Sequence, residues 1–67
     1  MPLFRFDVII KNQRTDETET ISKEYFGCSW FDALDLVTEF VKELLEQRAK
    51  ETGKYDWYLD SIKNYLS

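Results

Sequence analysis

Residues 29–53 read SWFDALDLVTEFVKELLEQRAKETG, and this stretch decides the fold because it predicts one long amphipathic helix. Ser29 is a favourable N-cap residue, and Asp32 follows three residues later as in a capping box. Gly53 fits the position after the last helical turn, where glycine enters the left-handed region at low cost. The predicted helix therefore covers about residues 30–52, which is roughly 33 Å of helix.

The apolar residues of this helix recur at helical spacing and form a single stripe. The stripe consists of Trp30, Ala33, Leu34, Val37, Phe40, Val41, Leu44, Leu45 and the aliphatic stem of Arg48. The acidic residues lie on or beside the opposite face, where helix charges are ordinarily solvated. A stripe of this length needs a long apolar surface to cover it, and a short hairpin alone is not enough.

Two β-strands are expected ahead of the helix. Apolar residues alternate with other residues in the first strand, about residues 3–11, and the alternation has the strand period of two. Its apolar face, expected in the core, consists of Phe4, Phe6, Val8 and Ile10. Residues 12–17 are polar and suit a hairpin loop, and residues 18–27 have the Thr, Ile and aromatic content of a second strand. The sequence does not decide which face of the second strand is buried, because Ile21 and Tyr25 would lie on one face and Phe26 on the other.

The segment from about residue 55 to residue 66 has two interpretations. Tyr55, Tyr58, Leu59, Ile62 and Leu66 recur at helical spacing and would give a C-terminal helix, hence a ββαα fold. The aromatic content instead favours a strand, and a two-stranded hairpin is only marginally stable without a third strand. The right-handed crossover rule places such a strand beside the first strand and parallel to the second. We therefore predict one α+β domain over residues 1–67, with ββαβ order.

The composition excludes several kinds of chemistry. The sequence has no histidine and a single cysteine, Cys28, so it holds no internal disulfide, no ordinary zinc site and no Ser-His-Asp triad. Gly27 and Gly53 stand alone, which leaves no glycine-rich phosphate loop. We therefore predict that the protein is not an enzyme, and we expect no catalytic residues, no metal, no cofactor and no small-molecule substrate.

Two weaker signals have ordinary structural explanations. Cys28 precedes the helix start, where a thiol can become reactive, but no histidine or second cysteine is present to support such chemistry. Asp32, Asp35 and Glu39 approach one helix face, yet the spacing of a calcium loop is missing. We interpret the cysteine as a packed corner residue and the carboxylates as a solvated face.

The charge and hydropathy patterns also limit partners and location. The net charge is −4, and the nine basic residues are scattered among acids rather than gathered in a patch, which disfavours nucleic acid as a partner. No apolar run approaches the 18 or more residues of a membrane span, and the first residues lack the pattern of a signal peptide. A lone free cysteine suits a reducing compartment. We expect a cytoplasmic protein with no membrane contact.

The sheet face away from the helix is the predicted functional surface. A single helix covers one face of a small sheet, and apolar or aromatic residues on the other face usually indicate an interface. The first strand would present Leu3 and Ile9 there, with polar residues between them. If the last segment is a strand, Trp57, Leu59 and Tyr65 join this face. These five residues are the predicted partner-binding site, for another protein or a second copy in a homodimer.

The sequence resembles known proteins only in general features. The passage Thr20 to Val37 is similar to many small α+β proteins in which a strand leads into a helix, but it contains no functional motif. In size and composition the chain resembles the accessory proteins of phages and mobile elements, which implies an inhibitor or adaptor. We predict a non-enzymatic protein-binding or self-associating module. The alternative is a nucleic-acid-binding accessory protein that uses a local basic and aromatic sheet face.

Overall fold

The computed structural model describes residues 3–66 and contains three strands and one helix in these residues. The elements are β1 (Leu3–Asn12), β2 (Thr18–Phe26), α1 (Trp30–Thr52) and β3 (Trp57–Leu66). The strands form one sheet in the order β2-β1-β3, and β1 runs antiparallel to both neighbours. The prediction of a ββαβ fold with the last strand beside the first is therefore confirmed, and the alternative of a C-terminal helix is excluded.

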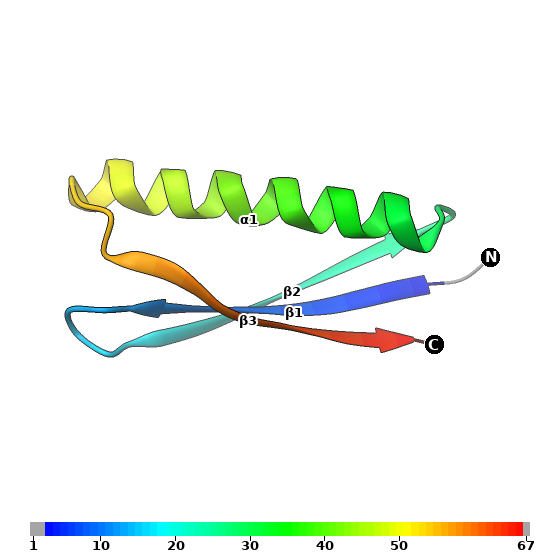
Figure 1. The fold of residues 1–67 in the computed structure, drawn as a ribbon, viewed down its shortest axis with the longest axis horizontal. Helices are drawn as coiled ribbons and strands as arrows, with labels where there is room; N and C mark the ends of the chain where they lie inside the picture. The colour runs from blue at the N-terminus through cyan, green and yellow to red at the C-terminus, as the bar shows by residue number, and fades with distance from the viewer. Residues whose placement is uncertain (1–2, 67) are drawn as a thin grey trace.

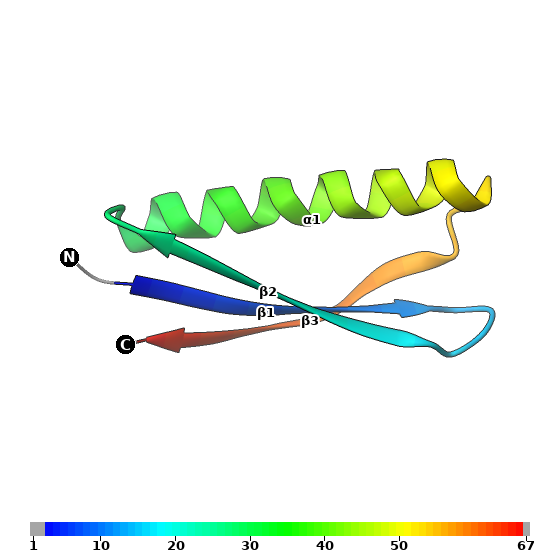
Figure 2. The ribbon, with the colours of Figure 1, turned by 180° about the vertical axis from the view of Figure 1, so that it is seen from behind.

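The helix lies along one face of the sheet and runs nearly the full length of the strands (Figure 1 and Figure 2). Its 23 residues correspond to roughly 34 Å, and the 10 residues of β1 correspond to roughly 33 Å. The two layers are matched in length, and the molecule is elongated, with extents of 40 × 18 × 13 Å. The third strand supplies the additional surface that the long apolar stripe requires.

The core lies between the central strand and the helix. Phe6, Val8 and Ile10 are at most 1% exposed, and Phe4 is also buried, so the alternation in β1 selects the buried face as expected. On the helix side the buried residues facing this cluster are Ala33, Val37 and Val41. Trp30 closes one end, with its ring stacked on Phe6 at 5.7 Å between ring centroids and edge-on to Phe4 at 5.6 Å.

Both predicted ends of the helix are confirmed. The Ser29 hydroxyl accepts a hydrogen bond from the backbone N–H of Asp32 at 3.2 Å, which satisfies one of the free donors of the first turn. Gly53 adopts a left-handed conformation, with φ of 73°, and its N–H donates to the Ala49 carbonyl at 2.7 Å. Leu34 was predicted within the buried stripe but is 39% exposed.

A β-bulge interrupts the pairing of β1 with β3. Ile9 lies opposite Ser61, but Ile10 lies opposite Leu59, so Asp60 is an extra residue of β3 at this point. An extra residue shifts the alternation of side chains by one position. The side chains of β3 before Asp60 therefore lie on the opposite faces from those that an uninterrupted strand would give.

Arg48 ties the helix to both outer strands. Its guanidinium donates two hydrogen bonds to the carboxylate of Glu19 on β2, one from Nη1 to Oε1 at 3.1 Å and one from Nη2 to Oε2. The same group lies over the ring of Trp57 on β3, 5.3 Å from its centroid. A guanidinium suits this position because its planar fork binds a carboxylate at two points while its face stacks on an aromatic ring.

We expect Arg48→Met to lower the free energy of unfolding by about 1–2 kcal/mol, because it removes charge-assisted hydrogen bonds but keeps the aliphatic stem. Urea denaturation followed by far-UV circular dichroism measures this change. Lys42→Met is the matched control, since Lys42 makes only an exposed ion pair with Glu39, at 3.7 Å. We expect the control to change the free energy of unfolding by less than about 0.5 kcal/mol. Equal effects of the two variants would contradict a bridging role for Arg48.

Candidate functional site

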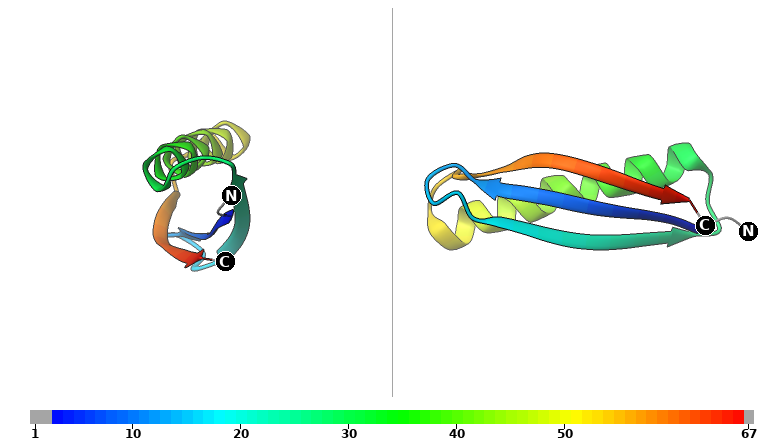
Figure 3. Two further views of the ribbon diagram at one scale, coloured as in Figure 1. Left: turned by 90° about the vertical axis from the view of Figure 1, so that its right-hand side faces the viewer. Right: turned by 90° about the horizontal axis from the view of Figure 1, so that it is seen from below.

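The sheet face that α1 does not cover is the candidate site, and we call it the open face. It is turned toward the viewer in the right-hand view of Figure 3, where the helix lies behind the strands. Residues directly opposite each other on antiparallel strands share a face, so the strand register defines its members. They are Leu3, Arg5, Asp7, Ile9 and Lys11 of β1, Thr18, Thr20, Ser22, Glu24 and Phe26 of β2, and Tyr58, Ser61, Lys63 and Tyr65 of β3.

The open face exposes several large apolar or aromatic side chains. Phe26 is 69% exposed and lies opposite Leu3, while Tyr65 is 48% exposed and lies opposite Arg5, so these residues gather at one end. Ile9 lies further along the central strand and is half-buried by its neighbours. Tyr58 is exposed near the opposite end. Singly exposed apolar residues are ordinary, but a group on one uncovered face is typical of an interface.

The charged residues of the open face are mixed in sign and centre on Asp7. Its carboxylate accepts a hydrogen bond from the Ser22 hydroxyl at 2.7 Å and lies 3.8 Å from Nε of Arg5. Lys63 lies directly opposite Asp7 on β3, and Glu24 lies opposite Arg5 on β2. Basic and acidic residues therefore alternate across the sheet, and the open face has no continuous positive track for a phosphate backbone.

The exposed side of α1 carries three apolar residues, Phe31, Leu34 and Leu36, which are 75%, 39% and 48% exposed, among many charged ones. It carries exposed carboxylates along most of its length, from Asp32, Asp35, Glu39, Glu43, Glu46 and Glu51, against the ammonium groups of Lys42 and Lys50. Within residues 3–66 no group of three or more potential metal ligands is found. No helix in the same residues is long and apolar enough to cross a membrane. The excess negative charge of the chain thus lies mainly on the helix side.

The structure brings together three of the five predicted partner-binding residues. Leu3, Ile9 and Tyr65 lie on the open face. Leu59 pairs with Ile10 and Trp57 with Asn12, so both lie on the helix side of the sheet, and Trp57 packs against the core. Their expected position on the open face was wrong, because the bulge at Asp60 reverses the alternation.

Sequence reasoning missed Phe26 and Tyr58 as members of the open face. Tyr58 follows from the same bulge, which exchanges the faces of residues 57–59. The facing of Phe26 depends on the pairing of β2 with β1, in which Ile21 and Tyr25 oppose the buried Val8 and Phe4. The register of β2 with β1, which pairs Phe26 with Leu3, is the signal that would have placed Phe26 on the open face.

The two edges of the sheet are protected against pairing with further strands. On the β2 edge Glu19 and Lys23 lie opposite the buried residues Ile10 and Phe6, so their charged side chains are on the helix side. The Lys23 ammonium lies over the Phe40 ring at 4.7 Å, and Glu19 binds Arg48. The β3 edge contains the bulge at Asp60. Inward-pointing charges and bulges are the devices by which sheet edges avoid edge-to-edge association.

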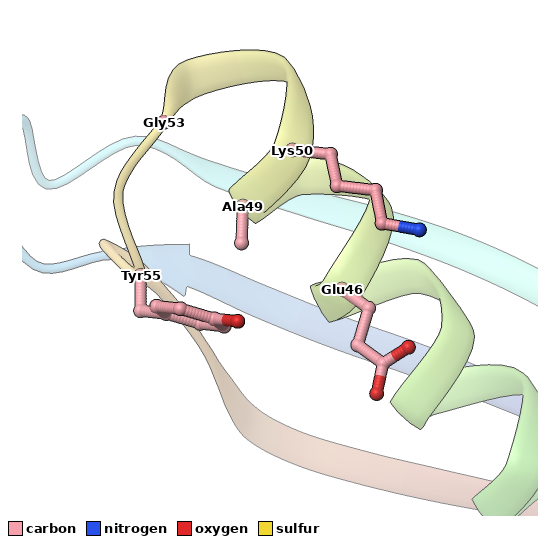
Figure 4. Close-up of a pocket in the computed structure, with 5 residues that line it drawn as sticks. All are labelled: Glu46, Ala49, Lys50, Gly53 and Tyr55. Carbon is pink, nitrogen blue, oxygen red and sulfur yellow. The ribbon is translucent and has the colours of Figure 1, made fainter.

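A depression of about 300 Å³ lies near the end of the helix, as Figure 4 shows. It is lined by Glu46, Ala49, Lys50, Gly53 and Tyr55. Tyr55 is 81% exposed, and the lining side chains come mostly from one face of the helix end. Enclosure and convergent polar groups are what distinguish a small-molecule site. This depression is not enclosed, since Tyr55 at its rim is largely exposed, and it does not compete with the open face.

Burial raises the pKa of the Tyr25 phenol above its ordinary value of 10.0, and electrostatic interaction with the nearby Cys28 side chain raises it further. A raised phenol pKa means that the folded state holds the proton more tightly than the unfolded chain. Below about pH 10 both states are protonated and the difference contributes nothing. Above that pH the unfolded chain loses its proton first, so the folded state loses stability as the pH rises.

We therefore expect the wild-type free energy of unfolding to fall more between about pH 9 and about pH 11 than that of Tyr25→Phe. Urea denaturation at both pH values measures the difference. Cys28→Ser should give an intermediate fall, since it removes only the smaller cause. Identical pH dependence in Tyr25→Phe and the wild type would show that Tyr25 does not couple folding to pH.

Comparison with protein-family models, with curated proteins and with solved structures found no match to this chain. Among the described residues, the open face is the surface where exposed aromatic side chains, half-buried aliphatic side chains and balanced charges occur together.

Proposed function

We propose that the chain is a small non-enzymatic module whose open face binds protein, either another protein or a second copy. The single observation that carries this proposal is the exposure of Phe26, Tyr58 and Tyr65 on one uncovered sheet face beside Leu3 and Ile9. Aromatic residues are enriched in protein interfaces because they bury large areas at a low conformational cost. The charged residues Arg5, Asp7, Glu24 and Lys63 between them supply polar groups for an interface.

The distribution of charge supports protein rather than nucleic acid as the partner. Grooves for single-stranded nucleic acid combine aromatic side chains with a positive track along the backbone path. On the open face Asp7 and Glu24 interrupt the basic residues Arg5 and Lys63, and Ser22 and Thr20 fill the β2 side. An alternation of signs suits a protein surface with the complementary alternation.

The biological setting is proposed from the same features. The sequence has no histidine, and residues 3–66 hold no cluster of potential metal ligands, which together support a non-catalytic role. The single free cysteine supports the cytoplasm as the compartment. A small acidic module with one binding face would act as an inhibitor or adaptor, in the manner of phage and mobile-element accessory proteins.

Affinity capture from an extract of the native host tests the proposal. The chain is immobilised through a tag, and captured proteins are identified by mass spectrometry, in parallel with sedimentation analysis of the purified chain. The double variant Phe26→Ser/Tyr65→Ser changes exposed residues of the open face, so it should retain the fold. Leu36→Ser is the control, since Leu36 is 48% exposed on the helix, as is Tyr65 on the sheet.

The expected result is a partner held by the wild type and by Leu36→Ser, but recovered about tenfold less by the double variant. Self-association with the same dependence on the variants is equally a positive result. The proposal fails if the double variant binds as well as the wild type. It also fails if no partner is captured and the purified chain is a monomer at all concentrations.

A further inference from the structure

Four successive open-face residues of the central strand form a self-complementary pattern. They are Leu3, Arg5, Asp7 and Ile9, which read apolar, positive, negative and apolar, and Lys11, the fifth open-face residue of β1, lies outside this pattern. Reading these four residues backwards gives the same apolar positions with the charges exchanged. A β1 strand laid face to face and antiparallel on its own copy therefore brings Leu3 near the second Ile9 and Arg5 near the second Asp7.

The flanking strands fit the same arrangement. A two-fold axis at the level of Phe6, between Arg5 and Asp7, lays each outer strand across its own copy. On β3 it places Tyr65 near Lys63 of the second copy, an aromatic ring beside a cation. On β2 it places Glu24 near Ser22 and Phe26 near Thr20. None of these pairs brings like charges together, which is what a two-fold symmetric interface requires.

We propose that the open face binds the open face of a second copy, in a two-fold dimer with antiparallel central strands and Arg5 paired to Asp7 across the axis. This inference rests on the proposed function, and it names the occupant. Two sheets then pack face to face about 10 Å apart, as in a β-sandwich, with a helix on each outer side.

The size of the open face sets the strength of this dimer. With the axis at the level of Phe6, residues 3–9 of β1 and the strand segments beside them overlap over a face of about 14 Å by about 23 Å, so two copies bury on the order of 650 Å² in total. This area lies below the range of stable specific interfaces, and the dimer is therefore expected to be weak and strongly dependent on concentration. Dimerisation through the outer helix face instead would bring two rows of carboxylates together.

The complementary charges allow a decisive experiment. Arg5→Asp gives two negative positions on β1, and Asp7→Arg gives two positive positions, so each single variant repels its own copy. Sedimentation equilibrium over a range of concentrations should show a dimer for the wild type. Each single variant should have an association constant lower by about tenfold or more. An equimolar mixture of the two single variants should regain association as a heterodimer.

Two controls keep the outcome interpretable. Circular dichroism and urea denaturation establish that each variant is folded, since the exchanges also alter the pairs with Glu24 and Lys63 on neighbouring strands. Should either charge variant be unfolded, the exposed-residue variant Phe26→Ser/Tyr65→Ser must lower association instead. Lys42→Asp reverses a charge on the outer helix face and should leave the dimer intact.

A wild-type chain that stays monomeric at about 1 mM would overturn the dimer, as would single variants that associate as strongly as the wild type. A monomer that nevertheless captures a different protein through Phe26 and Tyr65 would retain the proposed function and reject only the second copy as occupant. An unchanged dimer in the open-face variants would place association on another surface.

Discussion

Replacing Phe6 with alanine is expected to unfold most of the chain in the absence of denaturant. Phe6 is 1% exposed at the centre of the sheet, and its ring contacts Trp30 on the helix at 5.7 Å and Tyr25 on β2 at 6.1 Å between centroids. Removing a buried phenylalanine side chain costs about 3–5 kcal/mol, through lost burial and the cavity left behind. A domain of this length has only about that much stability to lose.

Far-UV circular dichroism of Phe6→Ala measures the loss directly, and urea denaturation gives the free energy where a folded baseline remains. Phe26→Ala is the matched control, because it removes the same group from a position that is 69% exposed. The control should keep the wild-type free energy of unfolding within about 0.5 kcal/mol. Similar losses in the two variants would contradict the assignment of even-numbered β1 residues to the core.

The helix and the first strand were predictable because their signals are local. Ser29 and Gly53 mark the helix ends through backbone requirements that involve only neighbouring residues. The alternation in β1 identifies the buried face without knowledge of any partner strand. The third strand was predictable because a two-stranded hairpin is only marginally stable and the aromatic content of the last segment favours a strand.

The facing of the outer strands was not predictable in the same way. The face of the sheet on which the Trp57 side chain lies depends on an extra residue, Asp60, and nothing in the local sequence requires a bulge there. The facing of Phe26 depends on its pairing with Leu3, which is a contact between distant residues. Strand register is fixed by tertiary pairing and by the hairpin loop, so a shift of one residue exchanges the two faces.

The hairpin loop shows how that register is held. The buried side-chain oxygen of Asn12 accepts hydrogen bonds from the backbone N–H groups of Arg14 and Thr15, at 2.8 and 3.1 Å. Asp16 adopts a left-handed conformation, with φ of 62°, and its N–H donates to the Asn12 carbonyl at 2.8 Å. These contacts set where β1 ends and β2 begins, and therefore which residues of β2 reach the open face.

Trp57→Ala is expected to lower the free energy of unfolding by about 2–3 kcal/mol and to leave association through the open face unchanged in the folded fraction. The indole is half-buried on the helix side, where it packs against the core and lies under the Arg48 guanidinium. Full burial would make the loss larger, at about 3–5 kcal/mol for tryptophan. Urea denaturation gives the stability, and sedimentation equilibrium gives the association.

Tyr58→Ala is the matched control because it changes the adjacent residue, which lies on the opposite face and is 41% exposed. It should lower stability by less than about 1 kcal/mol. The pair of variants tests the bulge itself, since an uninterrupted strand would exchange the positions of residues 57 and 58. A Tyr58→Ala variant that is strongly destabilised, beside a Trp57→Ala variant of wild-type stability, would require β3 to pair with β1 without the extra residue at Asp60.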